Sequence, residues 1–174
     1  MARQDKSPFK DDAEVLNYAL TLEHLEATFY REALDTFDDT AYTDAGYQTS
    51  VRDYIKEIGD HEAQHVEALT AAIKQLDGKP VEEASYDFGY TDLASFLSTA
   101  AAIEGVGVAA YTGAAQYLQD NGDLLTAALT IHGVEARHAS YLNVLTGAVP
   151  FPDAVDAPMT PDEILKIAGP FIKS

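Results

Sequence analysis

The sequence contains no cysteine among its 174 residues. Disulfides, zinc–thiolate sites and thiol catalysis are therefore excluded together. Any bound metal must use nitrogen and oxygen ligands, which suit iron, manganese or zinc. The length is that of one domain, large enough to bury a single hydrophobic core without covalent crosslinks.

Basic residues are also scarce: 11 Lys and Arg stand against 29 Asp and Glu, for a net charge of −18. Such a surface repels nucleic acid, which needs a basic footprint, so we expect no nucleic-acid partner. The acidic residues are spread along the chain rather than collected in a tail. This distribution indicates a strongly solvated surface, and it favours a halophilic origin, where salt screens the repulsion between like charges.

Long apolar segments are missing as well. The first ten residues lack the apolar core of a signal peptide and are expected to be a flexible N-terminus. The most apolar stretch, from Leu93 to Leu118, is interrupted by Glu104 and Gln116. We therefore expect a cytoplasmic protein that does not associate with a membrane.

Helical periodicity fills most of the remaining sequence. The first predicted helix opens at Asp11 or Asp12 and ends at 38–40, before a loop that contains Gly46. The second ends at 77–78, the third runs from a cap at Thr91 to 121–122, and the fourth ends at residue 147. A short fifth helix begins after residue 160, where the order Thr-Pro-x-Glu is typical of a helix start.

The lengths of the connections indicate the topology. Helices three and four are joined by two or three residues and must be antiparallel neighbours. The link between helices two and three has about 13 residues and can span roughly 40 Å, the length of a helix of about 28 residues. The sequence thus predicts an all-α, ferritin-like four-helix bundle over 11–147, with two antiparallel hairpins joined by a long crossover. Residues 148–174 are predicted to form a strap and a short C-terminal helix that pack on the bundle.

Acidic and imidazole side chains interrupt the apolar stripes of all four helices at matched depth. A weak internal repeat relates the first helix to the third, and the Glu-x-x-His of the second to that of the fourth. Spacings of three, four and seven residues place these side chains on the buried seam. The predicted cluster consists of Glu23, Glu62, His65, Glu104, Glu135 and His138.

Four buried carboxylates that face one another cost several kcal/mol each unless they are neutralised. None of the 11 basic residues falls on these seam positions. Two divalent cations would supply a charge of +4, and carboxylates with one histidine per metal suit iron or manganese. One Glu from each of two helices, with Glu-x-x-His from each of the other two, is the ligand pattern of di-iron carboxylate bundles. We therefore predict two iron or two manganese ions per chain.

The run LNYALTLEHLEATFY, residues 16–30, resembles the first helix of the ferritin-like family that includes desiccation-related proteins. Residues 157–161 and 170–172 resemble the C-terminal segment of that family, and the similarity extends over residues 11–172. The resemblance implies a ferritin-like bundle with the six ligands named above. It does not imply a particular reaction.

Several further residues have two possible roles. Glu26 lies one turn after Glu23 and resembles the extra carboxylate of rubrerythrin-type peroxidases, or it is a half-exposed flank residue. Tyr30 and Tyr111 lie two turns from the ligands of their helices, where ferritin-like oxidases often place a tyrosine with a redox or hydrogen-bonding role; packing alone is the other interpretation.

His61 and His132 lie near ligand positions in the sequence and are candidates to orient the ligands from behind. Alternatively, these two histidines lie at the edges between helices. His24, which is adjacent to Glu23, is expected on the surface. The third helix contains Gly105, Gly107 and Gly113, explained either by close helix packing or by an opening for a small oxidant beside the ligands.

Three functions remain open from the sequence. The first is an oxidoreductase or oxidant scavenger with ferroxidase, peroxidase or catalase-like activity, whose partners are dioxygen, peroxide or ferrous iron. The second is a non-catalytic stress- or desiccation-associated protein fastened by its metals, and the third is an iron-storage subunit. A homo-oligomer is compatible with each.

Overall fold

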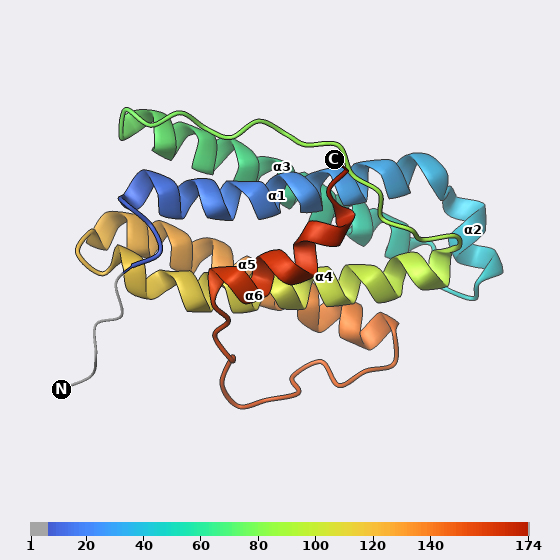
Figure 1. Ribbon diagram of the computed structural model, residues 1–174. Coiled ribbons are helices and arrows are strands. Elements are labelled where there is room, and N and C mark those ends of the chain that lie inside the picture. Colours follow the sequence, from blue (N-terminus) through green and yellow to red (C-terminus); the bar gives the residue numbers. More distant parts are fainter. Residues whose placement is uncertain (1–6, 174) are drawn as a thin grey trace.

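The computed structural model describes residues 7–173, and within them the chain is all-α, as predicted (Figure 1). The predicted flexible N-terminus falls mostly outside the described residues; within 7–10, the ring of Phe9 packs 5.5 Å from that of Tyr18. The helices, in order, are α1 (Asp12–Thr36), α2 (Asp39–Asp44), α3 (Ser50–Gln75), α4 (Leu93–Ala114), η1 (Ala115–Leu118), α5 (Gly122–Leu145), α6 (Pro161–Ala168) and η2 (Gly169–Phe171).

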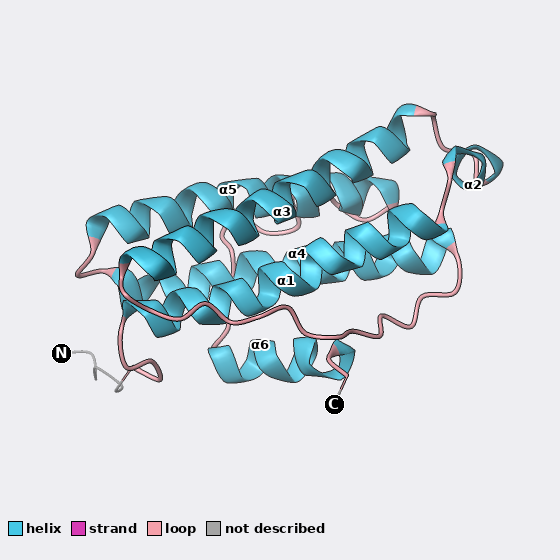
Figure 2. Cartoon of the chain, turned by 90° about the horizontal axis from the view of Figure 1, so that it is seen from above, coloured by secondary structure: helices cyan, strands magenta, loops and turns pink. Residues whose placement is uncertain are grey.

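Four long helices form the bundle, and they pair as two hairpins. Helix α1 packs mainly against α3, and α4 packs mainly against α5. The segment between α3 and α4 runs the length of the bundle, so that these two helices point in the same direction (Figures 1 and 2). The single long crossover predicted from the lengths of the connections is therefore confirmed.

The crossover is held against the outer face of α1 by polar side chains spaced seven residues apart. Asn17 donates from its side-chain nitrogen to the carbonyl of Lys79, and its side-chain oxygen accepts from the backbone N–H of Val81. A ring nitrogen of His24 lies 3.2 Å from the carbonyl oxygen of Val81. The expectation that His24 lies on the surface is wrong, because the crossover half-buries it.

The helix ends follow from their capping residues, with two corrections. The side chain of Asp11 caps α1, and Thr160 with Glu163 forms the predicted capping box of α6. Helix α4 is capped by Asp92 rather than by Thr91, since Asp92 accepts the N–H of Ser95 at 2.7 Å. The predicted loop around Gly46 contains the short helix α2, because Asp38 caps a helical turn that the apolar pattern did not reveal.

After α5 the chain leaves the bundle as a strap and returns to it at the end of the strap, where the N–H of Met159 donates to the carbonyl of Ala109. Gly113 permits this approach, since a Cβ atom there would lie 1.9 Å from the Met159 carbonyl oxygen. Helix α6 then lies across α1 and α4 (Figure 1).

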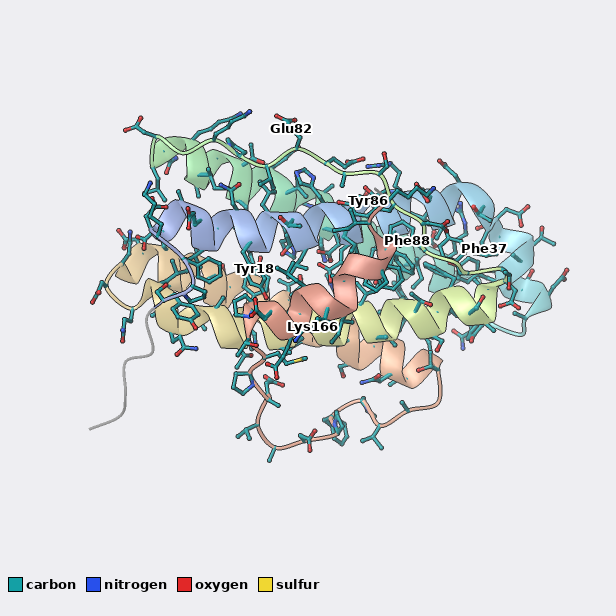
Figure 3. The ribbon with its side chains drawn as sticks, in the orientation of Figure 1. Tyr18, Phe37, Glu82, Tyr86, Phe88 and Lys166 are labelled. Carbon is teal, nitrogen blue, oxygen red and sulfur yellow. The ribbon has the colours of Figure 1, made fainter. Side chains whose placement is uncertain are left out.

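The C-terminal end of the chain meets the crossover where Figure 3 labels Tyr86 and Phe88. There the backbone N–H of Asp87 donates to the carbonyl of Phe171, and Tyr86 forms an antiparallel bridge with Ile172. The crossover and the C-terminal segment therefore hold each other against the bundle.

The stretch Leu93–Leu118, which forms α4 and η1, has a mean hydropathy of 1.5 and is long and apolar enough for a membrane span. Core helices have the same composition, and 56% of its most apolar window is buried inside the bundle. Glu104 lies in the middle of this helix with its side chain fully buried. We therefore interpret α4 as the core helix of the bundle.

Candidate metal centre

The six predicted ligands lie together in the middle of the bundle. The four long helices contribute Glu23 from α1, Glu62 and His65 from α3, Glu104 from α4, and Glu135 and His138 from α5. All four carboxylates are fully buried, and the two imidazoles are 8% exposed or less. The apolar stripes carry these side chains inwards because each occupies a position of the helical repeat that faces the seam.

The ligand atoms form two overlapping groups. One group is Glu23, Glu62, His65 and Glu135, and the other is Glu62, Glu104, Glu135 and His138; within each, one ligand atom per residue lies within 4.8 Å of the rest. Glu62 and Glu135 belong to both groups. The two groups could hold a pair of cations, with Glu62 and Glu135 available to both and one further carboxylate and one imidazole available to each.

Two tyrosines hold the terminal carboxylates from the opposite hairpin. The hydroxyl of Tyr30 donates to Oε1 of Glu104 at 2.5 Å, and that of Tyr111 donates to Oε1 of Glu23 at 2.5 Å. Burial and the neighbouring carboxylates raise the pKa of both phenols well above 10, so they remain protonated donors. The other carboxylate oxygen of each of these glutamates is available to the centre. The two tyrosine–glutamate hydrogen bonds correspond to each other in the internal repeat of the sequence.

Both imidazoles present Nδ1 to the carboxylates. Nδ1 of His65 lies 3.0 Å from Glu62 and 3.2 Å from Glu23, and Nδ1 of His138 lies 2.9 Å from Glu62. Burial lowers the pKa of His65, but hydrogen bonds to the carboxylates outweigh it and raise this pKa to about 12. The same balance raises the pKa of His138 to about 9. The carboxylates therefore attract positive charge strongly at these positions.

The protein alone leaves the cluster unsatisfied. Four carboxylate oxygens, buried from solvent, accept no well-aligned hydrogen bond, although some lie within ion-pair distance of an imidazole: Glu62 Oε1, Glu104 Oε2, Glu135 Oε1 and Glu135 Oε2. Burial and the charge of Glu104 raise the pKa of Glu62 to about 7, and the same causes raise that of Glu135 well above its usual value. Among residues 7–173, the ion pairs of the four carboxylates are with His65 and His138 alone. Hard oxygen donors without partners fit divalent cations.

Glu26 points into this region rather than lying on the flank of the helix. Its side chain is only 2% exposed, and burial together with the charges of Glu135 and Glu23 raises its pKa well above the usual value. The symmetric position on α4 is Gly107, and a Cβ atom there would lie 3.0 Å from both Glu26 Oε1 and Glu135 Oε2. Gly107 therefore makes room for a fifth carboxylate, whereas a Cβ atom at Gly105 would meet no heavy atom within 4 Å.

The two candidate supporting histidines lie in different environments. His61 stacks on His138, and its Nδ1 lies 3.0 Å from Nε2 of that ring, so it contacts a predicted ligand from behind. His132 lies between α5 and the strap: its Nε2 is 3.0 Å from Thr112 Oγ1 and 3.5 Å from Asp156 Oδ2. The structure thus brings His61 to the centre and His132 to a helix edge.

Sequence reasoning missed the C-terminal residues that lie beside Glu26. Ile167, Ala168 and Phe171 border the same cavity as Glu26. The amphipathic pattern of α6 predicts that one face of this helix packs on the bundle, but it does not indicate where along the bundle that face lies.

Four helices that enclose a shared carboxylate–imidazole cluster define a helical bundle with a centre that could hold a pair of metal ions. Residues 11–148 match the ferritin-like domain family, and the chain belongs to that family. A curated relative, Protein rds1 of Schizosaccharomyces pombe, is 25% identical over 168 residues. That alignment covers 95% of this chain and 40% of the yeast protein, so the chain spans less than half the length of this relative.

Proposed function

We propose that the chain binds two iron or two manganese ions and acts as an oxidoreductase or oxidant scavenger on dioxygen, peroxide or ferrous iron. The observation that carries this proposal is the pair of ligand groups that share Glu62 and Glu135. Such a metal pair, when bound, supplies electron transfer by changing between divalent and trivalent states.

The protein's own residues would hold and tune this centre. Glu62 and Glu135 would contribute to holding both ions, and Glu23 and Glu104, each hydrogen-bonded to a tyrosine hydroxyl at 2.5 Å, would each contribute to holding one of them. Hard anionic oxygens stabilise the more highly charged state of a metal. Glu26 supplies one more buried carboxylate than the two four-residue groups contain, and its negative charge would add to the stabilisation of the more highly charged state.

A purely structural role, as in a stress- or desiccation-associated protein, is the second candidate. Structural metal sites are closed, whereas catalytic ones keep a position free for a reactant. A cavity bordered by Glu26 and Gly107 lies on one side of the cluster, and this space for a reactant supports the redox function. The third candidate, an iron-storage subunit, requires assembly into a large cage, which gel filtration tests.

Oxidation kinetics test the proposal. Protein loaded with ferrous iron should be oxidised by dioxygen or peroxide in stopped flow, then be reduced and oxidised again without loss of helicity. If the centre holds its metal but the metal does not change oxidation state, the redox function is wrong and the structural role is supported instead. We also propose a cytoplasmic location without membrane or nucleic-acid partners, which cell fractionation and binding assays test.

A further inference from the structure

A cavity of about 110 Å³ is lined by residues of α1, α4 and the C-terminal segment that includes α6. Figure 1 shows α6 lying across α1 and α4. Glu26 is the one residue of the cavity lining that has a polar side chain. Leu22 and Leu25 line it from α1, Ile103 lines it from α4, and Phe171 lines it from the C-terminal segment. None of these apolar residues belongs to the two ligand groups.

The cavity extends from the surface to the edge of the cluster. Its outer lining includes Ala102, which is exposed, and Ile167, which is 42% exposed. Its inner lining includes Glu26 and Gly107, both buried. Because Glu26 Oε1 and Glu135 Oε2 both lie 3.0 Å from the vacant Cβ position of Gly107, the inner end of the cavity adjoins a predicted bridging ligand.

The chemistry of the wall restricts what can occupy this space. A buried water needs two to four polar partners, and the side chains of this wall offer one carboxyl group. An engineered cavity of about 150 Å³ lined by Leu, Ile and Phe stays dry and binds benzene or xenon. A hydrated ferrous ion would lose its water against such a wall without replacement ligands, at a large cost. Hydrogen peroxide would likewise lose most of its hydrogen bonds.

We propose that this cavity binds a small, uncharged, apolar molecule, and that dioxygen reaches the Glu26 edge of the carboxylate cluster through it. The binding of an apolar molecule depends only on the cavity. The assignment of dioxygen rests on the proposed redox function. Of the three substrates proposed there, which are dioxygen, peroxide and ferrous iron, dioxygen is the apolar one. Helix α6 has a role in this proposal, because it closes one side of the route.

Xenon is the probe for binding, because it is apolar and visible in crystals. In crystals of the metal-loaded protein under xenon pressure, one xenon atom should appear between Leu25 and Ile103. Ala168→Phe and Val106→Phe both fill the cavity, from α6 and α4 respectively, and should abolish this xenon density. Leu165→Phe changes the same helix at a side chain that is 42% exposed and does not line the cavity, and should retain it.

An empty cavity in wild-type crystals would overturn the proposal, as would xenon that persists in both filled variants. If a filled variant fails to fold, the other one decides, since the two substitutions lie on different helices. Xenon binding requires neither metal nor turnover. If the protein proves to hold no metal, the proposed function fails, and the same xenon experiment on metal-free crystals still tests the cavity.

Oxidation rates test the delivery of dioxygen. In filled variants with wild-type metal content, oxidation of the reduced centre by dioxygen should slow by about tenfold or more, which is about 1.4 kcal/mol in the barrier. Oxidation by hydrogen peroxide, and both rates in Leu165→Phe, should stay near wild type. Equal slowing with both oxidants, or unchanged rates despite the loss of xenon, would overturn the assignment of dioxygen.

Discussion

Removal of the metal from the centre should make the stability of this protein fall as pH rises. Without a cation, the buried carboxylates face one another, and among residues 7–173 their ion pairs are with the two imidazoles alone. Burial and the charge of Glu104 raise the pKa of Glu62 from 4.5 to about 7, and that of Glu135 is raised in the same way. The perturbation is extraction of the metal by a chelator.

The sign follows from proton counting. Between pH 4.5 and 7 the folded chain keeps a proton on Glu62 that the unfolded chain has lost, so unfolding releases a proton and a rise in pH destabilises the fold. A pKa difference of about 2.5, at about 1.4 kcal/mol per pKa unit, gives about 3 kcal/mol from this residue. The folded pKa of His65, about 12, acts in the same direction at higher pH: its stabilisation is complete below about 6.5 and is lost as pH approaches 12.

Denaturant unfolding of metal-free and metal-loaded protein from pH 5 to pH 8, at constant ionic strength, measures the effect. The loaded protein is the matched control, because it has the same acidic surface and differs only at the centre. The metal-free form should lose at least about 3 kcal/mol over this range, while the advantage of the loaded form grows with pH. Equal pH dependence in the two forms would refute the electrostatic account of the cluster.

Three further changes test separate parts of the account. Glu104→Ala should lose metal, whereas Glu26→Ala should keep both ions and slow reoxidation by peroxide; full occupancy in Glu104→Ala, by metal titration, would show that the ligand set is wrong. Tyr111→Phe leaves an oxygen of Glu23 buried without its hydrogen bond, so the metal-free protein should unfold with about 1–3 kcal/mol less free energy, and an unchanged value in denaturant would contradict this. The melting temperature should rise steeply between low and molar salt, because salt screens a net charge of −18, and a flat curve would contradict the halophilic interpretation.

The fold and the six-residue cluster could be predicted because both depend on periodicity along single helices. Seven-residue spacing places Glu23 and Glu104 on the same face as Tyr30 and Tyr111, and the structure retains that placement. The crossover followed from the lengths of the connections, which set its direction without reference to its contacts. These inferences need only the geometry of one helix at a time.

What the sequence did not reveal depends on contacts between segments far apart in the chain. His24 was expected on the surface because it follows Glu23 directly and so points away from the seam, but the crossover covers it at Val81. His132 is close to Glu135 in sequence but points to Thr112 and the strap. Three residues turn a helix by about 300°, so His132 and His138 lie on opposite sides of Glu135 around the helix axis, and His138 is the one that faces the cluster. The cavity beside Glu26 requires α6 to lie at one place along α1 and α4, which no local pattern determines.

The metal content of the protein tests the central claim most directly. Protein purified without added metal, or reconstituted aerobically with iron or manganese and freed of excess metal, should carry close to two ions per chain by elemental analysis. Glu62→Ala should lower the content of both sites together, since this residue belongs to both ligand groups. Protein that stays metal-free after reconstitution with either metal would contradict the account.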